Sequence, residues 1–342
     1  MTVSRAIAVE AIEPDSPDAG VPAHFGDPMR EQRTLATGSG LVDRSNRGVI
    51  AVTGPDRLSW LHDITTQHLA GLPPLTGTET LVLSPHGHVE HHAVLLDDGE
   101  TTLLDVEPGT APGLLDFLQR MRFMLRVEPV DASADWALYT VAGPSDLAEP
   151  DVLPVPGPKF PAGTVPPRPT TRYSVSGLAS GGYARRMPYG VDLLVPRGAP
   201  PGVPDVGLWA FEALRVGDRR PRLGPDTDHR TLPAELGWIA EAVHLEKGCY
   251  RGQETVARVH HLGRPPRRLA LLHLDGIAAD TPPAPHTPVT TEDGREVGFA
   301  GTAVRHYELG MIAIALLKRS VPDDAPLRVA GFAAAIEPDG GP

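Results

Sequence analysis

The sequence predicts an α+β protein in which helices and mixed antiparallel sheets precede a small C-terminal antiparallel β-barrel. Short strand-like runs follow one another through tight turns, whereas a dinucleotide-binding protein would alternate strands with helices and carry a Gly-x-Gly-x-x-Gly turn. A chain of 342 residues is also longer than one hydrophobic core usually serves. We therefore expect two or three packed units.

Hydrophobic periodicity places the expected helices and strands. Strands show alternating or short β-branched runs, and helices show apolar residues three and four positions apart, as at Leu114, Leu118 and Met121. A further helix is expected to open at Gly54-Pro55-Asp56, where proline suits the first turn. The expected strands lie at 48 to 53, 81 to 83, 89 to 96, 101 to 106, 254 to 260, 268 to 274 and 311 to 317, and the other expected helices at 112 to 126 and 208 to 216.

Composition divides the chain into segments. Residues 1 to 23 are acidic, contain prolines and are poor in aromatic residues, which predicts a disordered tail. Many prolines and few large apolar residues mark 149 to 169 as a surface loop. A turn at Glu292-Asp293-Gly294 and the apolar run near the C-terminus predict the barrel over residues 263 to 337.

Overall composition excludes several classes of protein. A single cysteine allows no intrachain disulfide and no cysteine-based metal array, and it fits a reducing compartment. The sequence shows no apolar run of the length of a signal peptide or a membrane span, so we expect a cytoplasmic protein without membrane contact. The formal net charge of -12 argues against binding a nucleic-acid backbone over a broad surface.

Histidines at alternate positions raise the question of a metal site. His86, His88, Glu90 and His92 would share one face of a strand. Four successive positions along one strand extend too far to surround a single ion, and no distant ligand is evident. We expect no metal site there.

The only cysteine lies in an unusual setting, the octapeptide 247 to 254, Lys-Gly-Cys-Tyr-Arg-Gly-Gln-Glu. A cysteine kept for packing usually lies among apolar residues. Here Lys247 and Arg251 flank Cys249 and can stabilise its thiolate. The local residues fit a reactive thiol and a space-filling turn equally well.

The octapeptide resembles the Lys-Gly-Cys-Tyr/Phe-x-Gly-Gln-Glu signature of the YgfZ-type folate-binding proteins, which are relatives of the glycine cleavage T-protein, an aminomethyltransferase. Residues 49 to 61, 83 to 89 and 212 to 215 resemble further parts of that superfamily. The resemblance runs from about His24 into the C-terminal strands. It implies a folate-binding, T-protein-like region over 24 to 262, with two interleaved α+β subdomains.

The resemblance implies tetrahydrofolate or a derivative as the cofactor. A pterin ring presents adjacent donors that a carboxylate or amide accepts, and a glutamate tail requires cations. Each charged residue proposed for these roles could instead form an ordinary surface salt bridge. The expected cofactor-binding residues are Glu212, Arg215, Tyr250, Gln253, Glu254 and Arg258, and the expected catalytic residues are Cys249, as a reactive thiol, and Lys247.

Two departures from the T-protein pattern guide the expected function. Gly217 stands where the T-protein has a folate-binding glutamate, and Glu90-His91-His92 replaces its paired aspartates. The resemblance therefore favours iron-sulfur cluster assembly or repair, including clusters of tRNA-modifying radical enzymes, with client or assembly proteins as partners. One cysteine cannot hold a conventional cluster alone, so any cluster would be shared with a partner.

Two alternatives stay open, and with them the question of whether the protein is an enzyme. The first is a true aminomethyltransferase of glycine cleavage, a folate-dependent one-carbon transferase. The second is a noncatalytic adaptor that binds RNA or protein through basic residues between Arg258 and Arg268. Such RNA binding would weaken steeply with salt, and we do not expect it.

Overall fold

The computed structural model describes residues 6–144, 173–262, 264–276 and 281–338. The loop expected at 149 to 169 lies outside these residues. The chain forms two compact units. Unit 1 comprises Met1–Val82, His91–Phe211 and Ala242–Tyr250, and unit 2 comprises Leu83–Glu90, Glu212–Glu241 and Arg251–Pro342. Unit 2 therefore takes in more of the chain than the barrel expected at 263 to 337.

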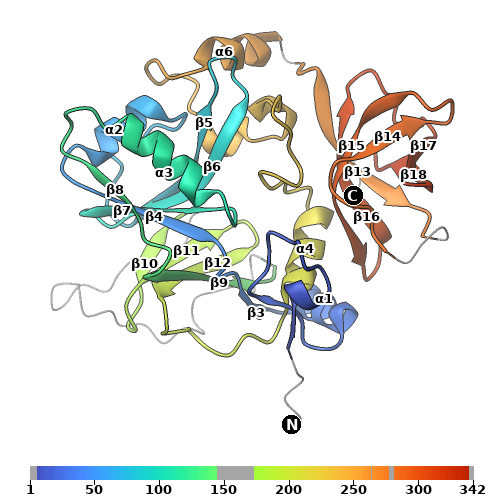
Figure 1. Ribbon diagram of the computed structural model, residues 1–342, viewed down its shortest axis with the longest axis horizontal. Helices are drawn as coiled ribbons and strands as arrows, with labels where there is room; N and C mark the ends of the chain where they lie inside the picture. Colours follow the sequence, from blue (N-terminus) through green and yellow to red (C-terminus); the bar gives the residue numbers. More distant parts are fainter. Residues whose placement is uncertain (1–5, 145–172, 263, 277–280, 339–342) are drawn as a thin grey trace. The chain divides into compact units, whose positions relative to one another are not determined.

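One five-stranded sheet of unit 1 carries two helices on one face (Figure 1). Its strand order is β5-β6-β7-β4-β8. Trp60 and Leu61 of one helix, and Leu114 and Leu118 of the other, pack on strand residues that include Leu95. The elements are β4 (Gly48–Thr53), α2 (Arg57–Ile64), β5 (Thr76–Leu83), β6 (Val89–Asp97), β7 (Thr101–Val106), α3 (Ala111–Arg120) and β8 (Glu128–Asp131).

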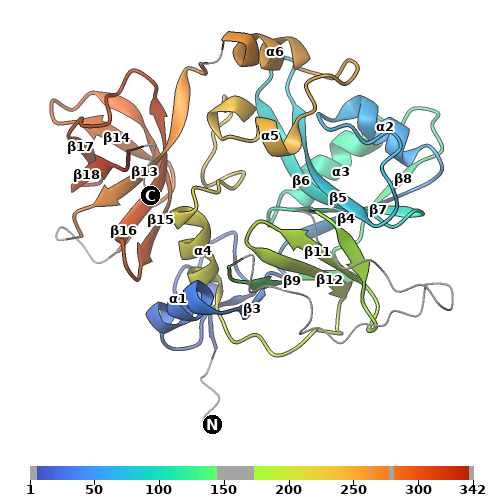
Figure 2. The same cartoon turned by 180° about the vertical axis from the view of Figure 1, so that it is seen from behind.

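A second five-stranded sheet of unit 1 has the order β10-β11-β12-β9-β3 (Figure 2). Val49 and Leu103 of the first sheet share a buried cluster with Leu138 and Leu194 of the second, so the two sheets pack face to face. The elements are β3 (Gly40–Asp43), β9 (Trp136–Ala142), β10 (Val175–Gly177), β11 (Tyr183–Met187) and β12 (Gly190–Pro196).

The N-terminal residues differ from the expected disordered tail from Ala6 onward. β1 (Ile7–Ala8) pairs with β2 (Pro22–His24), and the 3-10 turn Val9–Ala11 buries Val9. Val9 and Val21 are each only 1% exposed, although the composition of this segment gave no sign that it is packed. Helix α1 (Pro28–Thr37) follows because the Asp27 side chain accepts a hydrogen bond from the Arg30 amide at 3.0 Å, and proline suits the first turn.

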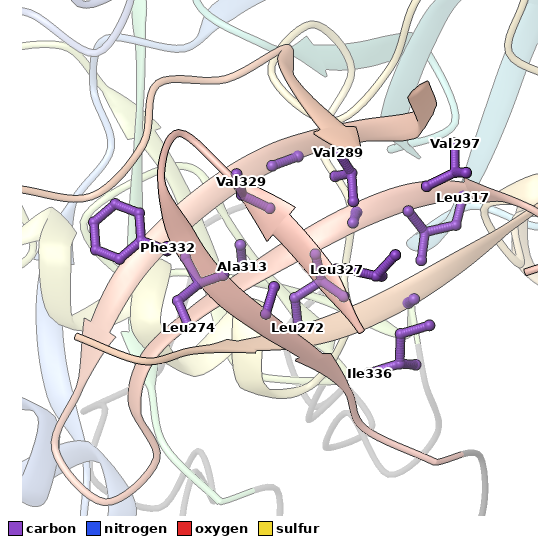
Figure 3. Close-up of a cluster of buried hydrophobic side chains, with 14 of the residues drawn as sticks. Leu272, Leu274, Val289, Val297, Ala313, Leu317, Leu327, Val329, Phe332 and Ile336 are labelled. Carbon is purple, nitrogen blue, oxygen red and sulfur yellow. The ribbon is translucent and has the colours of Figure 1, made fainter. Parts of the chain in front are cut away.

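Unit 2 ends in a closed antiparallel barrel with the strand order β13-β16-β15-β14-β17-β18. Figure 3 shows its core, to which Leu272, Val289, Leu317 and Phe332 contribute. The α+β prediction with a C-terminal antiparallel barrel is therefore confirmed. The strands are β13 (Arg267–Leu274), β14 (Thr287–Thr291), β15 (Glu296–His306), β16 (Gly310–Lys318), β17 (Leu327–Val329) and β18 (Phe332–Ile336).

Strand β16 is apolar along its length because both of its faces are buried. Met311 and Ala313 face the barrel core, whereas Ile312 and Ile314 pack with Val216 at the end of α4 (Leu208–Gly217). A continuous apolar run is what a strand buried on two faces requires. The predictions of this strand and of the helix over 208 to 216 are confirmed.

Three local predictions are wrong. Residues 254 to 260 lie in helix α6 (Gln253–Leu262), not in a strand. The helix expected to reach Arg126 ends at Arg120. His86 and His88 lie in the turn before β6, so the expected histidine face does not form a single strand surface. The remaining short helices are the 3-10 turn Pro233–Glu235 and α5 (Ile239–Ala242).

Among the described residues, no helix is long and apolar enough to cross a membrane. The same residues contain no group of three or more His, Cys, Asp or Glu side chains placed to hold a metal ion.

Candidate functional site

The lysine of the octapeptide anchors the loop to unit 1. The Lys247 ammonium donates hydrogen bonds to the carbonyls of His62, Thr65 and Gln67, at 2.5 Å for Thr65 and 3.3 Å for Gln67. These carbonyls lie at and just beyond the C-terminal end of α2, where a cation is favourable. Burial lowers the pKa of Lys247 to about 8. Three backbone acceptors thus bind the three ammonium protons.

The thiol of Cys249 is exposed on this loop. The two cations expected to activate it bind other groups: Lys247 binds backbone carbonyls, and the Arg251 guanidinium lies 3.0 Å from the Glu90 carboxylate. Within the described part of the chain, no contact joins either cation to the thiol. The reactive-thiol role of Cys249 stays a prediction, without the expected electrostatic support.

Two glycines bring the second half of the octapeptide close to the β5-β6 hairpin in unit 2. Gly252 has φ +82°, and a Cβ there would lie 2.8 Å from Gly87 Cα and 2.7 Å from Ser84 O. Only glycine fits this approach at a positive φ. The next residue, Gln253, begins α6, which leaves Glu254 and Arg258 exposed one turn apart.

Glu212 and Arg215 belong to a buried ion-pair network of unit 2. Arg215 Nε donates to Glu212 Oε1 at 2.8 Å, and its Nη1 donates to Asp226 Oδ2 at 2.9 Å. Arg222 lies 3.2 Å from the same glutamate. The Arg215 side chain is 3% exposed. This network accounts for the burial of both residues without a ligand, so their folate roles stay untested predictions.

A cluster that the sequence analysis missed lies in unit 1. The Glu79 cluster consists of Glu79 on β5, His92 on β6, Arg185 on β11, and Tyr173 in the turn just before β10. His92 Nε2 lies 2.8 Å from Glu79 Oε2, and the Tyr173 hydroxyl donates to Glu79 Oε1. Burial raises the pKa of Glu79, but hydrogen bonds from His92 and Tyr173 and the Arg185 charge outweigh it and lower the pKa overall. Glu79 is therefore a partly buried carboxylate that is ionised at neutral pH.

Arg185 gives this cluster unused hydrogen-bonding capacity. Its Nη2 donates to Asp105 at 2.6 Å and to Asp192 at 2.9 Å. Its Nε and Nη1 are buried, and no residue that the structure describes accepts a hydrogen bond from them. Such unpaired donors are uncommon in folded proteins, and an acceptor from water or a ligand would satisfy them.

An apolar and aromatic surface adjoins the cluster. Val94, Tyr173 and Met187 form one buried group, and Tyr189 packs against it. The Tyr189 ring meets Phe211 edge to face, with centroids 5.1 Å apart. A carboxylate beside aromatic side chains is the chemistry that a flat heteroaromatic ring with several N-H donors requires. The Glu79 and His92 side chains keep 13% and 10% exposure, so neither is fully enclosed.

One residue of the Glu79 cluster, His92, lies in a segment to which the sequence analysis drew attention. His92 lies in the segment that replaces the T-protein's paired aspartates, but its partner Glu79 comes from the neighbouring strand. Nothing local to Glu79 or Tyr173 marks them, because strand pairing and the packing of the two sheets bring them together.

Comparisons with known proteins place the chain among two kinds of relatives. No family model matches it. A chloroplast protein of Arabidopsis thaliana named as a transferase is 28% identical over 86% of this chain and 69% of its own length. An aminomethyltransferase of Moorella thermoacetica is 25% identical over 87% and 83%. A mitochondrial iron-sulfur cluster assembly factor IBA57 homologue of Neosartorya fischeri is 25% identical over 84% and 72%.

A solved structure identifies the architecture. The glycine cleavage system aminomethyltransferase T of Bartonella henselae superposes with a TM-score of 0.77, covering 98% of this chain and 94% of that protein, at 16% identity. At this identity the likeness concerns the fold alone. The chain has the fold of glycine cleavage aminomethyltransferase T.

Proposed function

We propose that the protein binds tetrahydrofolate or a derivative at the Glu79 cluster and that this binding supports assembly or repair of iron-sulfur clusters. The observation that carries the proposal is the partly buried Glu79 carboxylate, whose Oε2 lies 2.8 Å from His92 Nε2 beside a group of apolar and aromatic side chains. The relatives named as aminomethyltransferases and as iron-sulfur assembly factors support its two halves. The YgfZ-type assignment and the tRNA-modifying clients belong to the same proposal.

The residues of the cluster have distinct expected roles. The Glu79 carboxylate accepts the ring N-H and amino donors of the pterin, and His92 and Tyr173 orient it through their hydrogen bonds. Arg185 offers two donors that no described residue accepts, either to a carbonyl of the ligand or to a bridging water. A bound folate supplies the one-carbon carrier chemistry. We propose Cys249 as a transient contact for a cluster shared with a partner, because its thiol is exposed.

Titration of the reduced protein with tetrahydrofolate tests the folate half. Glu79→Gln removes the charge and keeps the shape, so we expect affinity to fall by at least about tenfold, as for loss of a charge-assisted hydrogen bond. Glu128→Gln is the matched control, because Glu128 is an exposed glutamate on β8 of the same unit. Absence of saturable binding by the unmodified protein, or equal affinity in the two variants, would overturn this half.

A complementation assay tests the proposed role in iron-sulfur cluster assembly. Cells whose own gene for this protein is deleted are supplied with either the unmodified protein or Cys249→Ser. We expect the unmodified protein to restore the activity of a cluster-dependent dehydratase, and Cys249→Ser to restore markedly less of it. Because Cys249 is exposed, the serine variant should fold and bind tetrahydrofolate normally. Full restoration by Cys249→Ser would show that the thiol is dispensable, whatever the folate titration gives.

Aminomethyl transfer is a second candidate, favoured by a specific observation. Glu79 places a partly buried carboxylate next to His92, which lies in the segment whose aspartates this chain lacks. Tetrahydrofolate-dependent release of ammonia from an aminomethyl-lipoyl carrier protein would establish this activity. If Glu79→Gln abolished that release, the carboxylate would serve this reaction; if no release occurred, the candidate would be excluded.

A further inference from the structure

The loop that follows α3 exposes large apolar side chains at its end. Met124 is 98% exposed and Phe123 is 79% exposed. The neighbouring Leu125 and Val130 are also more than one-third exposed, at 41% and 43%. Single exposed apolar residues are ordinary, but adjacent ones mark an interaction surface. We call Arg122, Phe123 and Met124 the apolar tip.

Interactions on both sides of the apolar tip hold it in place. On one side, Trp60 Nε1 donates to the Met121 carbonyl at 2.9 Å. On the other, Arg126 donates to Asp56 from its backbone amide at 2.9 Å and from Nη2 at 2.7 Å. Between them, Phe123 has φ +47°, an unfavourable conformation for a residue with a side chain. Strained backbone of this kind often accompanies a functional surface.

The charge on the apolar tip comes from one arginine. Arg120 pairs with Asp116 and Arg126 pairs with Asp56. Across the described residues, no ion pair neutralises Arg122. The tip therefore presents two apolar side chains beside one uncompensated cation. A complementary surface needs an apolar pocket with a carboxylate at its rim.

The barrel of unit 2 carries a surface of that kind. A groove of about 480 Å³ is lined by the end of β13, the loop before β17 and the outer face of β18. Leu274, Ala333 and Ala335 contribute to its apolar lining. Asp275 and Asp324 also line it, and neither forms an ion pair with any residue that the structure describes. A third carboxylate, Asp323, is already paired with Arg268.

We propose that the barrel groove of one copy of this chain receives the apolar tip of a second copy. The two surfaces match in apolar character and in charge: Phe123 and Met124 enter the apolar groove while Arg122 meets Asp275 and Asp324. Using two different surfaces makes the contact head to tail, so it generates rings or short chains. A contact this small is expected to be weak, concentration-dependent and sensitive to salt. This inference does not rest on the proposed function.

Sedimentation velocity of the full chain tests the contact. We expect reversible association between about 1 µM and about 1 mM, the range of weak interfaces. Met124→Asp, Arg122→Glu and Asp324→Arg should each weaken association by at least about tenfold. The double variant Arg122→Glu with Asp324→Arg exchanges the two charges and should recover association to within about threefold of the unmodified chain.

Arg30→Glu is the matched control for charge, since Arg30 is an exposed arginine on α1. All substituted residues are exposed, so circular dichroism should show every variant folded. A chain that stays monomeric throughout, association that survives Met124→Asp, or a double variant no better than the single ones would overturn the proposal. Equal weakening by Arg30→Glu would attribute the effect to net charge and overturn it too.

Discussion

Replacing Lys247 by methionine is the most informative perturbation of the octapeptide. Methionine keeps an unbranched side chain of similar length but removes the ammonium that binds three carbonyls. Three hydrogen bonds from a charged donor contribute roughly 4.5 to 9 kcal/mol at about 1.5 to 3 kcal/mol each. Against this, the variant no longer buries a charge: the fall in the pKa of Lys247 from 10.5 to about 8 corresponds to about 3 kcal/mol. We expect a net loss of stability of at least about 1.5 kcal/mol.

Urea unfolding at several pH values measures this loss. Burial lowers the pKa of Lys247, so between pH 8 and 10.5 the unfolded chain binds more protons than the folded chain. The contribution of Lys247 to the free energy of unfolding therefore rises with pH across this window, by up to about 3 kcal/mol. Lys247→Met should lack that rise. The anchoring role would be refuted if Lys247→Met and the unmodified protein had the same free energy of unfolding at pH 7. It would also be refuted if this free energy depended on pH in the same way for both proteins above pH 8. Lys247→Arg is the control that keeps the charge.

Two further predictions concern ionisable side chains: His91 and Arg215. Burial lowers the pKa of His91 from 6.5 to about 4. As the pH falls from 6.5 to 4, the imidazole of the unfolded chain is therefore protonated while that of the folded chain is not. The free energy of unfolding should fall by up to about 3 kcal/mol over this range. Urea unfolding of His91→Leu should show a flatter acid profile, and an unchanged slope would contradict this. Arg215→Met leaves Glu212 and Asp226 buried without their main partner and should cost about 3 to 5 kcal/mol by the same assay. A loss below about 1 kcal/mol would instead favour a ligand-binding role.

Patterns with a clear period were predicted well. The strand at residues 48 to 53 has the predicted bounds, and the buried strand near the C-terminus differs by one residue at each end. Both segments are short and rich in apolar residues, so burial and β-propensity agree. Helix α3 ends early because Met121 leaves the helix and begins the anchored loop, which periodicity alone does not reveal.

The mistaken strand at 254 to 260 shows where local residues mislead. Thr255, Val256 and Val259 are β-branched, which favours a strand over a helix by a small margin. The structure places them in α6, where Val256 is buried. The close approach of Gly252 and Gly87 positions the start of that helix. Tertiary context overrides propensity here, because differences in propensity are a fraction of a kcal/mol per residue, roughly 0.7 at most.

Local patterns in the sequence were enough to predict the fold class, the barrel and a cysteine in a polar turn, because hydrophobic periods and glycine turns are local properties. Which charged and polar groups contact one another could be seen only in the tertiary structure. It brought the Lys247 ammonium to backbone carbonyls, and it joined Glu79 to His92 and Tyr173. Such partnerships depend on strand register and sheet packing between distant residues, and a local pattern records neither.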